Sequence, residues 1–257
     1  MRQIKLHFAC ASIIFLILMS CVTMTNAETV AIWLFDEGKG EKITDFEGRG
    51  HEGEIKDGFK WVDGKFGKGL YLDSSGYVEI PHHDDFNFDE KMTIMIWAKL
   101  DDITPQDFVG MPRKEGEYVL AAHKLGGKME MTMWVNNGGW VGQIPDGGVG
   151  PSLDFGEWHH YATTYDGDTC RVYVDGEEIG DKKVGGAVSK GADILRLSNS
   201  CCDGRFMEGT LDEFIMAKDV FSEELIQEYM NKGVEMYLSV GPAGKLSITW
   251  GRLKTKG

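Results

Sequence analysis

The sequence predicts an all-β domain built from two antiparallel sheets, with one short helix near its C-terminal end. Glycine supplies 34 of the 257 residues, about 13% against roughly 7% in ordinary proteins, without a collagen-like period. Hydrophobic residues make up 42% and charged residues 26%, so the chain can build a packed core. Short β-branched and aromatic runs alternate with turn residues along the chain. Together these observations indicate many short strands joined by tight turns.

Residues 1–27 have the features of a secretory signal peptide. Two basic residues precede an apolar run at 8–19 that is too short to span a hydrocarbon core of about 30 Å. Two cleavage sites fit the pattern: one after Ala27, and one before Cys21, where a lipobox-like Leu-Met-Ser-Cys would lead to a lipid anchor. The sequence therefore predicts an exported protein without a transmembrane helix, either secreted, periplasmic or lipid-anchored to the cell envelope.

The charge of the chain excludes two classes of partner. The formal net charge is -14 at pH 7. Nucleic acids and anionic membranes are bound by clustered Lys and Arg side chains, which neutralise phosphates. We therefore expect neither a nucleic acid nor an anionic membrane surface as the partner.

The first strands follow from short apolar runs. The run at 30–35 is β-branched and aromatic and ends at Asp-Glu-Gly-Lys-Gly, as expected of a buried strand followed by a loop. Residues 70–80 predict two strands around a Ser-Ser-Gly turn. The segment 92–100 is apolar at both alternating sets of positions, which is typical of a strand in the centre of a sheet. Residues 101–117 are expected to form a long insertion.

The second half of the chain continues the pattern. Further strands are predicted at 117–122, 129–135, 158–165, 170–175, 194–198 and 210–217. Two Asp-Gly pairs, at 166–167 and 175–176, supply hairpin turns because they tolerate positive φ. Side chains alternate along the strand that follows Glu157, so we expect Trp158 in the core with His160 buried beside it.

One helix is predicted, at 223–232. Ser222 can cap its first turn, acidic residues favour its N-terminal end, and Gly233 can end it. The remaining residues, 234–257, carry a proline and several glycines. They predict either a poorly ordered terminus or an added edge strand or contact point.

Export changes how the cysteines are interpreted, since disulfides persist in oxidising compartments. Cys170, Cys201 and Cys202 remain after the leader is removed, and three thiols cannot all pair within one chain. A bridge from Cys170 to Cys201 or Cys202 is the preferred arrangement. A vicinal bond between Cys201 and Cys202, or a set of unpaired thiols, is the alternative.

Four sequence blocks stand in series. They are an Asp-Glu-Gly turn after the first strand (33–55), a Tyr-Val-Glu-Ile-Pro segment (64–81), a Trp-His-His strand followed by Tyr-Val-Asp-Gly (157–180), and Gly-Thr-Leu-Asp-Glu-Phe ahead of the helix (209–227). In this order they resemble the laminin-G-like jelly roll of the concanavalin A-like lectin/glucanase superfamily, as found in bacterial exported proteins. The resemblance implies a jelly-roll sandwich, a scaffold that carries many different functions.

The resemblance also implies a structural calcium ion between the N-terminal loop and the closing strand. Carboxylates and carbonyls at glycine turns suit Ca²⁺, which takes 6–8 oxygen ligands. Matched by motif, Asp45 and Asp212 are the candidate ligands, with Asp36 as a third. Arg49 and His51 stand where the family loop usually has asparagines, and a guanidinium repels a cation. The alternative is that the carboxylates only accept hydrogen bonds from turn amides.

The sequence carries no recognised catalytic motif. Retaining glycosidases place two carboxyl groups roughly 5–5.5 Å apart, and jelly-roll glucanases that resemble this fold carry them as Glu-x-Asp-x-x-Glu on one strand. That motif, a Gly-x-Ser-x-Gly elbow and a His-Glu-x-x-His are all absent from the sequence. The acidic groups Asp84-Asp85 and Glu208 with Asp212-Glu213 are interpreted as loop charges. We therefore predict that the protein is not an enzyme.

The candidate ligand-binding residues lie in a glycine-rich segment at 134–151. Sugars are bound by aromatic rings, which cover their CH groups, and by amides or acids, which bond their hydroxyls. Trp134, Asn136, Asn137 and Trp140 offer these chemistries. For each of them, packing inside the fold is the competing interpretation.

The sequence thus predicts three segments: a signal peptide at 1–27, a jelly-roll sandwich at 28–233 and a tail at 234–257. The predicted function is an exported, non-catalytic module that binds a carbohydrate or an extracellular protein, stabilised by calcium and one disulfide. A polysaccharide-active glycoside hydrolase with an unrecognised carboxylate pair is the first alternative. A structural adhesion module is the second.

Overall fold

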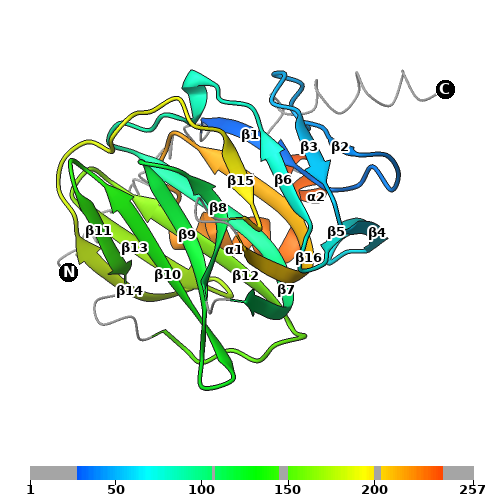
Figure 1. Cartoon of the computed structure of the whole chain (residues 1–257). Coiled ribbons are helices and arrows are strands. Elements are labelled where there is room, and N and C mark those ends of the chain that lie inside the picture. The colour runs from blue at the N-terminus through cyan, green and yellow to red at the C-terminus, as the bar shows by residue number, and fades with distance from the viewer. Residues whose placement is uncertain (1–27, 106–107, 145–149, 200–203, 240–257) are drawn as a thin grey trace, which may run out of the picture.

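The computed structural model describes residues 28–105, 108–144, 150–199 and 204–239. Within them, two antiparallel sheets of eight strands each stack face to face, and two short helices lie near the C-terminal end (Figure 1). The predicted two-sheet sandwich is therefore confirmed. The predicted signal peptide and the lipid-anchor cysteine, Cys21, lie outside the described residues.

Sheet A has the strand order β14-β13-β12-β7-β16-β5-β4, with β1 also paired to β16. Its strands are β1 (Thr29–Trp33), β4 (Phe59–Asp63), β5 (Lys68–Leu72), β7 (Met92–Pro105), β12 (Trp158–Tyr165), β13 (Thr169–Val174), β14 (Glu177–Lys183) and β16 (Arg205–Ala217). The first strand, β1, pairs with the last strand, β16, in this sheet, so the sheet joins the N-terminal and C-terminal parts of the domain.

Sheet B has the strand order β11-β10-β9-β8-β15-β6-β3-β2. Its strands are β2 (Lys42–Ile43), β3 (Gly53–Lys56), β6 (Tyr77–Ile80), β8 (Phe108–Lys114), β9 (Tyr118–Leu125), β10 (Lys128–Asn136), β11 (Trp140–Ile144) and β15 (Leu195–Leu197). In Figure 1 this sheet faces the viewer and sheet A lies behind it.

The two sheets enclose one apolar core, because each strand points alternate side chains inward. In β10, Met129, Met131 and Met133 belong to this core, whereas the side chains between them point outward. Trp33 of β1 is fully buried and its ring stacks on Phe214 with the ring centroids 4.9 Å apart. The core therefore buries the inner face of each sheet, and the outer face of each sheet lies outside this core.

Two helices, α1 (Glu223–Lys232) and α2 (Val234–Ser239), pack on the outer face of sheet A. Ser222 caps α1 with its side chain, and Gly233 ends the helix at a φ of 70°. The predicted helix is confirmed with the same bounds. The described part of the predicted tail forms α2, so a strand or a loose end there is wrong as far as residue 239. No described helix has the length and apolarity needed to cross a bilayer.

The strand β12 matches its prediction at 158–165, and both hairpin turns are confirmed. Gly167 and Gly176 have φ angles of 91° and 79°. His160 is buried with 2% of its surface exposed, and it faces the helix side of sheet A rather than the core between the sheets. Trp158 is only partly buried, because it lies at the end of β12 beside Lys99. Its predicted place in the core is wrong.

Several strands do not follow from the sequence pattern. The predicted insertion at 101–117 is instead the end of β7 followed by β8, an inner strand between β9 and β15. Proline is disfavoured inside a sheet, so Pro112 reads as a loop residue. The structure accommodates it at a register irregularity between Gly110 and Arg113, where the ladder is interrupted.

The predicted disulfide from Cys170 is not supported. Cys170 is a buried free thiol in β13. It pairs with Tyr165 at the end of β12, and Tyr165 pairs in turn with Met92 at the start of β7. Cys201 and Cys202 lie outside the described residues, and their described neighbours Asn199 and Phe206 bridge beside the end of β7. About twelve residues of strand separate the two places, roughly 40 Å, whereas a disulfide joins Cα atoms less than about 7 Å apart. A bond between the two adjacent cysteines stays a prediction.

Candidate functional site

The outer faces of the two sheets differ in what covers them. The outer face of sheet A packs against α1 and α2 and buries apolar side chains there, among them Met95, Tyr173 and Ile215. The outer side chains of sheet B are those that alternate with the core residues of β8, β9 and β10. This second face carries the tryptophans that the sequence singled out.

Trp134 and Trp140 lie on this face, in the neighbouring strands β10 and β11. Trp140 pairs with Asn136, two residues along from Trp134, and 40% of its surface is exposed. The Trp134 ring lies against the backbone of Gly142, where a Cβ atom would come within 1.8 Å of the ring. Two indoles are therefore held on one face of the sheet edge, one packed flat and one open to solvent.

Strand register continues this surface along β9 and β8. Thr132 and Glu130 of β10 pair with Ala121 and His123 of β9, and His123 also pairs with Phe108 of β8. The rings of His123 and Phe108 meet edge-on with their centroids 4.6 Å apart. From the level of Trp140 to that of His123 the surface runs over about six residues of strand, roughly 20 Å. We call the five side chains Phe108, His123, Thr132, Trp134 and Trp140 the aromatic patch.

Three polar groups of the aromatic patch have no hydrogen-bond partner among the described residues. They are His123 Nε2, Thr132 Oγ1 and the indole Nε1 of Trp134. Buried polar atoms are normally bonded, so a set of three on one face of two adjacent strands lacks partners that ordered water, or a ligand after a shift of the covering side chains, can supply. Burial, and to a smaller extent Arg205, lowers the pKa of His123. Its imidazole is therefore neutral at pH 7 and can either donate or accept one hydrogen bond at each nitrogen.

The two predicted asparagines have structural partners instead. Asn136 Oδ1 accepts hydrogen bonds from Gly138 N at 3.0 Å and Ser189 Oγ at 3.2 Å. Asn137 Nδ2 donates to the carbonyls of Val184 and Gly185. Both amides tie the β10–β11 turn to the loop before β15. They position the turn next to Trp140, and Asn136 Oδ1 and Asn137 Nδ2 are already used within the protein.

The predicted calcium ligands do not form one cluster. Asp45 accepts backbone hydrogen bonds within its own loop, from Glu47 N at 3.0 Å and Arg49 N at 2.7 Å. A carboxylate bonded in this way serves as a turn cap. These contacts agree with the alternative that Asp45 caps a turn, and its part in a calcium site stays a prediction.

Asp36 and Asp212 converge on the turn between β4 and β5. Asp36 Oδ1 accepts from Lys68 N at 2.6 Å, and Asp212 Oδ2 accepts from Phe66 N at 2.8 Å. Asp212 Oδ1 is buried without a partner. Burial, and then the charges of Glu213 and Asp36, raises the pKa of Asp212 to about 8. An unpartnered carboxylate oxygen beside other carboxylates fits a bound cation, as the sequence predicted for these two aspartates.

A catalytic carboxylate pair was the main test of the enzyme alternative. Glu54 and Glu79 face each other across β3 and β6. Lys56 bonds Glu54 and thereby lowers the pKa of that carboxyl, and Arg196 Nε lies 3.2 Å from Glu79 Oε1. A general acid in a glycosidase needs a raised pKa, which a bonded cation opposes. We therefore interpret Glu54 and Glu79 as members of ion pairs on neighbouring strands rather than as a catalytic pair.

In the part of the chain that the structure describes, raised carboxyl pKa values occur at Asp212 and Glu213. Burial raises the pKa of Glu213 to about 7, and its Oε1 accepts from Val234 N at 2.9 Å, at the start of α2. Both residues lie in β16 of sheet A, where they bond the β4–β5 turn and the helices. Their burial is explained by these structural contacts, away from the aromatic patch.

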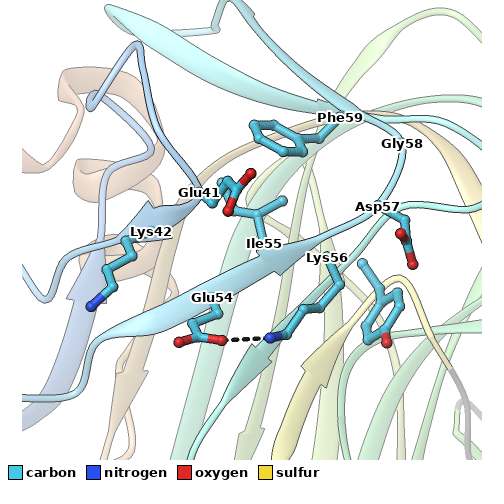
Figure 2. A pocket seen from close by; sticks show the side chains of 9 residues that line it. Glu41, Lys42, Glu54, Ile55, Lys56, Asp57, Gly58 and Phe59 are labelled. Carbon is cyan, nitrogen blue, oxygen red and sulfur yellow. Dashed lines mark hydrogen bonds and ion pairs between the residues drawn. The ribbon is translucent and has the colours of Figure 1, made fainter.

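A groove of about 650 Å³ lies at the other end of sheet B, where β2 and β3 meet the turn into β4. Figure 2 shows Glu41, Lys42 and Phe59 around it and the ion pair between Glu54 and Lys56 at its edge. Its lining is mostly charged side chains, and the pair at its edge is already neutralised. Two aromatic rings, Phe59 and Tyr77, also line the groove.

Sequence reasoning identified the two tryptophans and missed the rest of the aromatic patch. Phe108 and His123 come from segments that were interpreted as a loop and a strand end. Strict alternation from Tyr118 assigns Val119, Ala121 and His123 to one face, which is the signal that was available. Their pairing with β10 depends on register, which a single sequence does not specify.

The comparisons with known proteins agree with the fold. Residues 72–227 match the family model described as the concanavalin A-like lectin/glucanases superfamily. No curated protein sequence matches the chain. Domain 4 of AbnA, a GH43 extracellular arabinanase from Geobacillus stearothermophilus solved in complex with arabinotriose, is 19% identical with a TM-score of 0.64. The match covers 80% of this chain and 99% of that one.

Toxin binding domains are also similar in structure. The binding domain of Paraclostridial mosquitocidal protein 1 is 17% identical, with a TM-score of 0.60, over 79% of this chain and 52% of that chain. The binding domain of botulinum neurotoxin DC, in complex with rat synaptotagmin II, is 11% identical with a TM-score of 0.59, over 79% and 51%. This chain thus spans about half the length of those domains. At such identities the likeness shows the jelly-roll fold alone.

Proposed function

This chain belongs to the concanavalin A-like lectin/glucanases superfamily, and from that premise we propose that it is an exported, non-catalytic module that binds a carbohydrate. The observation that carries the proposal is the aromatic patch on the outer face of sheet B. Trp140 presents an exposed ring, and three neighbouring polar groups lack partners. This combination matches the chemistry of sugar recognition, in which rings cover CH groups and polar atoms bond hydroxyls.

The similar structures support a binding role in two ways. One is a domain of an extracellular arabinanase that was solved with arabinotriose, and others are binding domains of toxins. The toxin domain solved with synaptotagmin II makes an extracellular protein the second candidate ligand for this chain. The aromatic patch favours the carbohydrate, because it combines an exposed indole ring with polar atoms of neighbouring side chains on one face of the sheet.

A non-catalytic role is part of the same proposal. The paired carboxylates on the outer face of sheet B, Glu54 and Glu79, are bonded to cations. The carboxyl groups with raised pKa, Asp212 and Glu213, serve the β4–β5 turn and the helices of sheet A. A polysaccharide hydrolase would need an acid of raised pKa beside the bound sugar.

Calcium and export complete the proposal. We propose that Asp36 and Asp212 hold a structural calcium ion together with backbone carbonyls of the surrounding loops, without Asp45. Export is supported by the predicted leader at 1–27, which leaves open free secretion, the periplasm or a lipid anchor at Cys21. An extracellular place for this chain agrees with the extracellular arabinanase whose domain shares its fold.

A glycan array probed with the purified protein tests the proposed ligand class. We expect binding to a restricted set of polysaccharides, and loss of that binding in Trp140→Ala, because the exposed indole supplies the stacking surface. Met236→Ala is the control, since Met236 is a large apolar side chain that is 60% exposed and lies on α2, behind sheet A. The control should bind as the unaltered protein does.

Two outcomes would contradict this proposal. One is an array without signal from folded protein, which would favour a protein ligand. The other is release of reducing ends from a bound polysaccharide that stops when one carboxyl group is replaced, which would restore the enzyme alternative.

A further inference from the structure

A second cluster of polar side chains lies at the rim of the sandwich, apart from the aromatic patch. It forms where the loop before β3 meets the short 3-10 helix η1 (Asp84–Phe86). His51 from the loop, His83 at the cap of η1 and Asp85 inside it each offer one ligand atom, and these atoms lie within 4.8 Å of one another. Among the residues that the structure describes, no other group of three His, Cys, Asp or Glu side chains comes this close.

His51 is the fixed member of the cluster. Only 4% of its surface is exposed, and its buried Nε2 lies 3.2 Å from Asp85 Oδ2, with no further hydrogen-bond partner among the described residues. Trp33 Nε1 donates to its carbonyl oxygen at 2.7 Å, and the Phe86 ring packs 4.8 Å from its imidazole. Burial, and then the charge of His83, lowers the pKa of His51.

Asp85 and His83 supply the open side of the cluster. Asp85 Oδ2 lies 3.3 Å from His83 Nδ1, so one oxygen stands between two imidazole nitrogens at 3.2 and 3.3 Å. A tetrahedral zinc ion with bonds of about 2.0–2.2 Å holds its ligand atoms roughly 3.3 Å apart. In the structure His83 Nδ1 accepts a hydrogen bond from Asp85 N at 3.1 Å, so the ring has to turn before His83 can bind an ion. The side chains of His83 and Asp85 are 55% and 43% exposed, so an ion can enter from solvent and the His83 ring can turn.

Charged side chains from neighbouring elements surround the cluster. Lys218 Nζ lies 3.7 Å from the other oxygen of Asp85, Oδ1, and leaves Oδ2 to the histidines. Asp45 lies close enough to His51 to oppose the lowering of its pKa. The adjacent pair His82 and Asp84 is separate, with His82 Nε2 3.4 Å from Asp84 Oδ1.

We propose that His51, His83 and Asp85 form a binding site for a divalent transition-metal ion of the Zn²⁺ class. Two imidazoles and one carboxylate are ligands that suit zinc, nickel or cobalt, whereas calcium prefers oxygen ligands alone. Three protein ligands leave a further coordination position for water or for a group of a bound molecule. The ion satisfies the buried nitrogen of His51 and joins the loop before β3 to η1.

The test is a titration of the whole protein, purified without a histidine tag, with Co²⁺ and then Zn²⁺. We expect visible absorption from Co²⁺ in tetrahedral coordination, its loss when Zn²⁺ displaces Co²⁺, and one Zn²⁺ per chain by isothermal calorimetry. His83→Gln and Asp85→Asn change exposed side chains, so these variants should fold. Each should weaken Zn²⁺ binding by at least about tenfold, the lower end of what disturbing a metal site costs.

His82→Gln is the matched control, because it removes the neighbouring histidine and leaves the three ligands in place. It should bind Zn²⁺ as the unaltered protein does. The proposal is overturned if the unaltered protein binds neither ion, or if His83→Gln and Asp85→Asn bind as tightly as His82→Gln. His51→Gln adds a buried test of the same site wherever circular dichroism shows that it folds.

Discussion

Among the described residues, buried polar atoms without a hydrogen-bond partner occur in two kinds of place: candidate binding sites and the packed interior. Thr132 Oγ1 in the aromatic patch and His51 Nε2 in the rim cluster lie beside other groups that a ligand or an ion could join. His160 Nδ1 has no partner among the described residues either, but it is buried on the helix side of sheet A beside Trp97, its pair in β7, with the ring centroids 5.3 Å apart. The atoms of Thr132 and His51 indicate candidate binding sites, whereas the His160 atom only makes the packed interior less stable.

His160 predicts a loss of stability in mild acid. Burial lowers its pKa to about 3, opposed by Asp175, so the unfolded chain binds a proton below about pH 6.5 that the folded chain excludes. As the pH is lowered from 6.5 to 3, the free energy of unfolding should therefore fall by up to about 1.4 kcal/mol for each pH unit. Urea unfolding at several pH values measures this slope.

His160→Gln should flatten that slope relative to the unaltered protein, and His82→Gln, at a partly exposed site, should leave it unchanged. Equal slopes in all three proteins would show that the buried imidazole does not govern acid stability. Carboxyl groups contribute a background slope that is common to the three proteins, so the comparison isolates the imidazole.

Residue types at the candidate site were predictable from the sequence, and their partners were not. Glycines around Trp134 and Trp140 indicated a binding segment, and both rings do lie on one outer face. The amides of Asn136 and Asn137 bond Ser189 and the loop at 184–185, segments about fifty residues away. Nothing in the local sequence specifies such distant contacts. The sequence alone therefore does not distinguish an asparagine whose amide can bind a ligand from one whose amide is bonded within the protein.

At the scale of elements, the β10–β11 hairpin depends on one glycine. A Cβ atom at position 142 would come within 1.8 Å of Trp134 Cε3, so the ring has to move. Gly142→Ala should weaken glycan binding and cost about 1–3 kcal/mol of stability, as overpacking does. Calorimetric binding and thermal unfolding measure the two effects.

Gly139→Ala serves as the control in the same turn, because its Cβ atom would meet no atom within 4 Å. It should bind normally and keep its stability to within about 0.5 kcal/mol. If Gly142→Ala behaved in the same way, the packed position of Trp134 would not matter for binding.

The link between β16 and the β4–β5 turn predicts a response to calcium. Asp212 has a buried oxygen without a partner, and Asp36 lies near it, so Ca²⁺ should raise the melting temperature and a chelator should lower it. At a hundredfold excess over the dissociation constant the gain is about 2.7 kcal/mol. Differential scanning calorimetry with and without chelator measures it.

Asp212→Asn should abolish the calcium response, whereas Asp45→Asn should keep it, although it removes a turn cap. A response that survives in Asp212→Asn, or no response in the unaltered protein, would rule out calcium at this place.

Element prediction succeeded where local rules decide and failed where tertiary contacts do. The helix at 223–232 begins at a serine and ends at a glycine, and the structure has the same bounds. β8 was missed because Pro112 argues against an inner strand, and only pairing on both sides makes the segment Phe108–Lys114 a strand. The short strands β2 and β3 were missed because too few residues carry the alternation.

At the scale of the whole molecule, the helices decide which face can bind. They pack on the outer face of sheet A, and the core fills the space between the sheets. Sheet B therefore presents the surface that carries both the exposed indole of Trp140 and the partly covered indole of Trp134. The two-sheet architecture followed from composition and turns, but which sheet is covered follows only from the contacts of α1 and α2.

The most direct test of this account is the set of indole N–H signals in the ¹H–¹⁵N spectrum of the protein, with the strongest glycan from the array added stepwise. We predict that the signals of Trp134 and Trp140 shift in proportion to occupancy, while those of Trp33 and Trp97, buried elsewhere in the fold, stay in place. Shifts confined to Trp61 or Trp158, with Trp134 and Trp140 unmoved, would contradict a binding site on the outer face of sheet B.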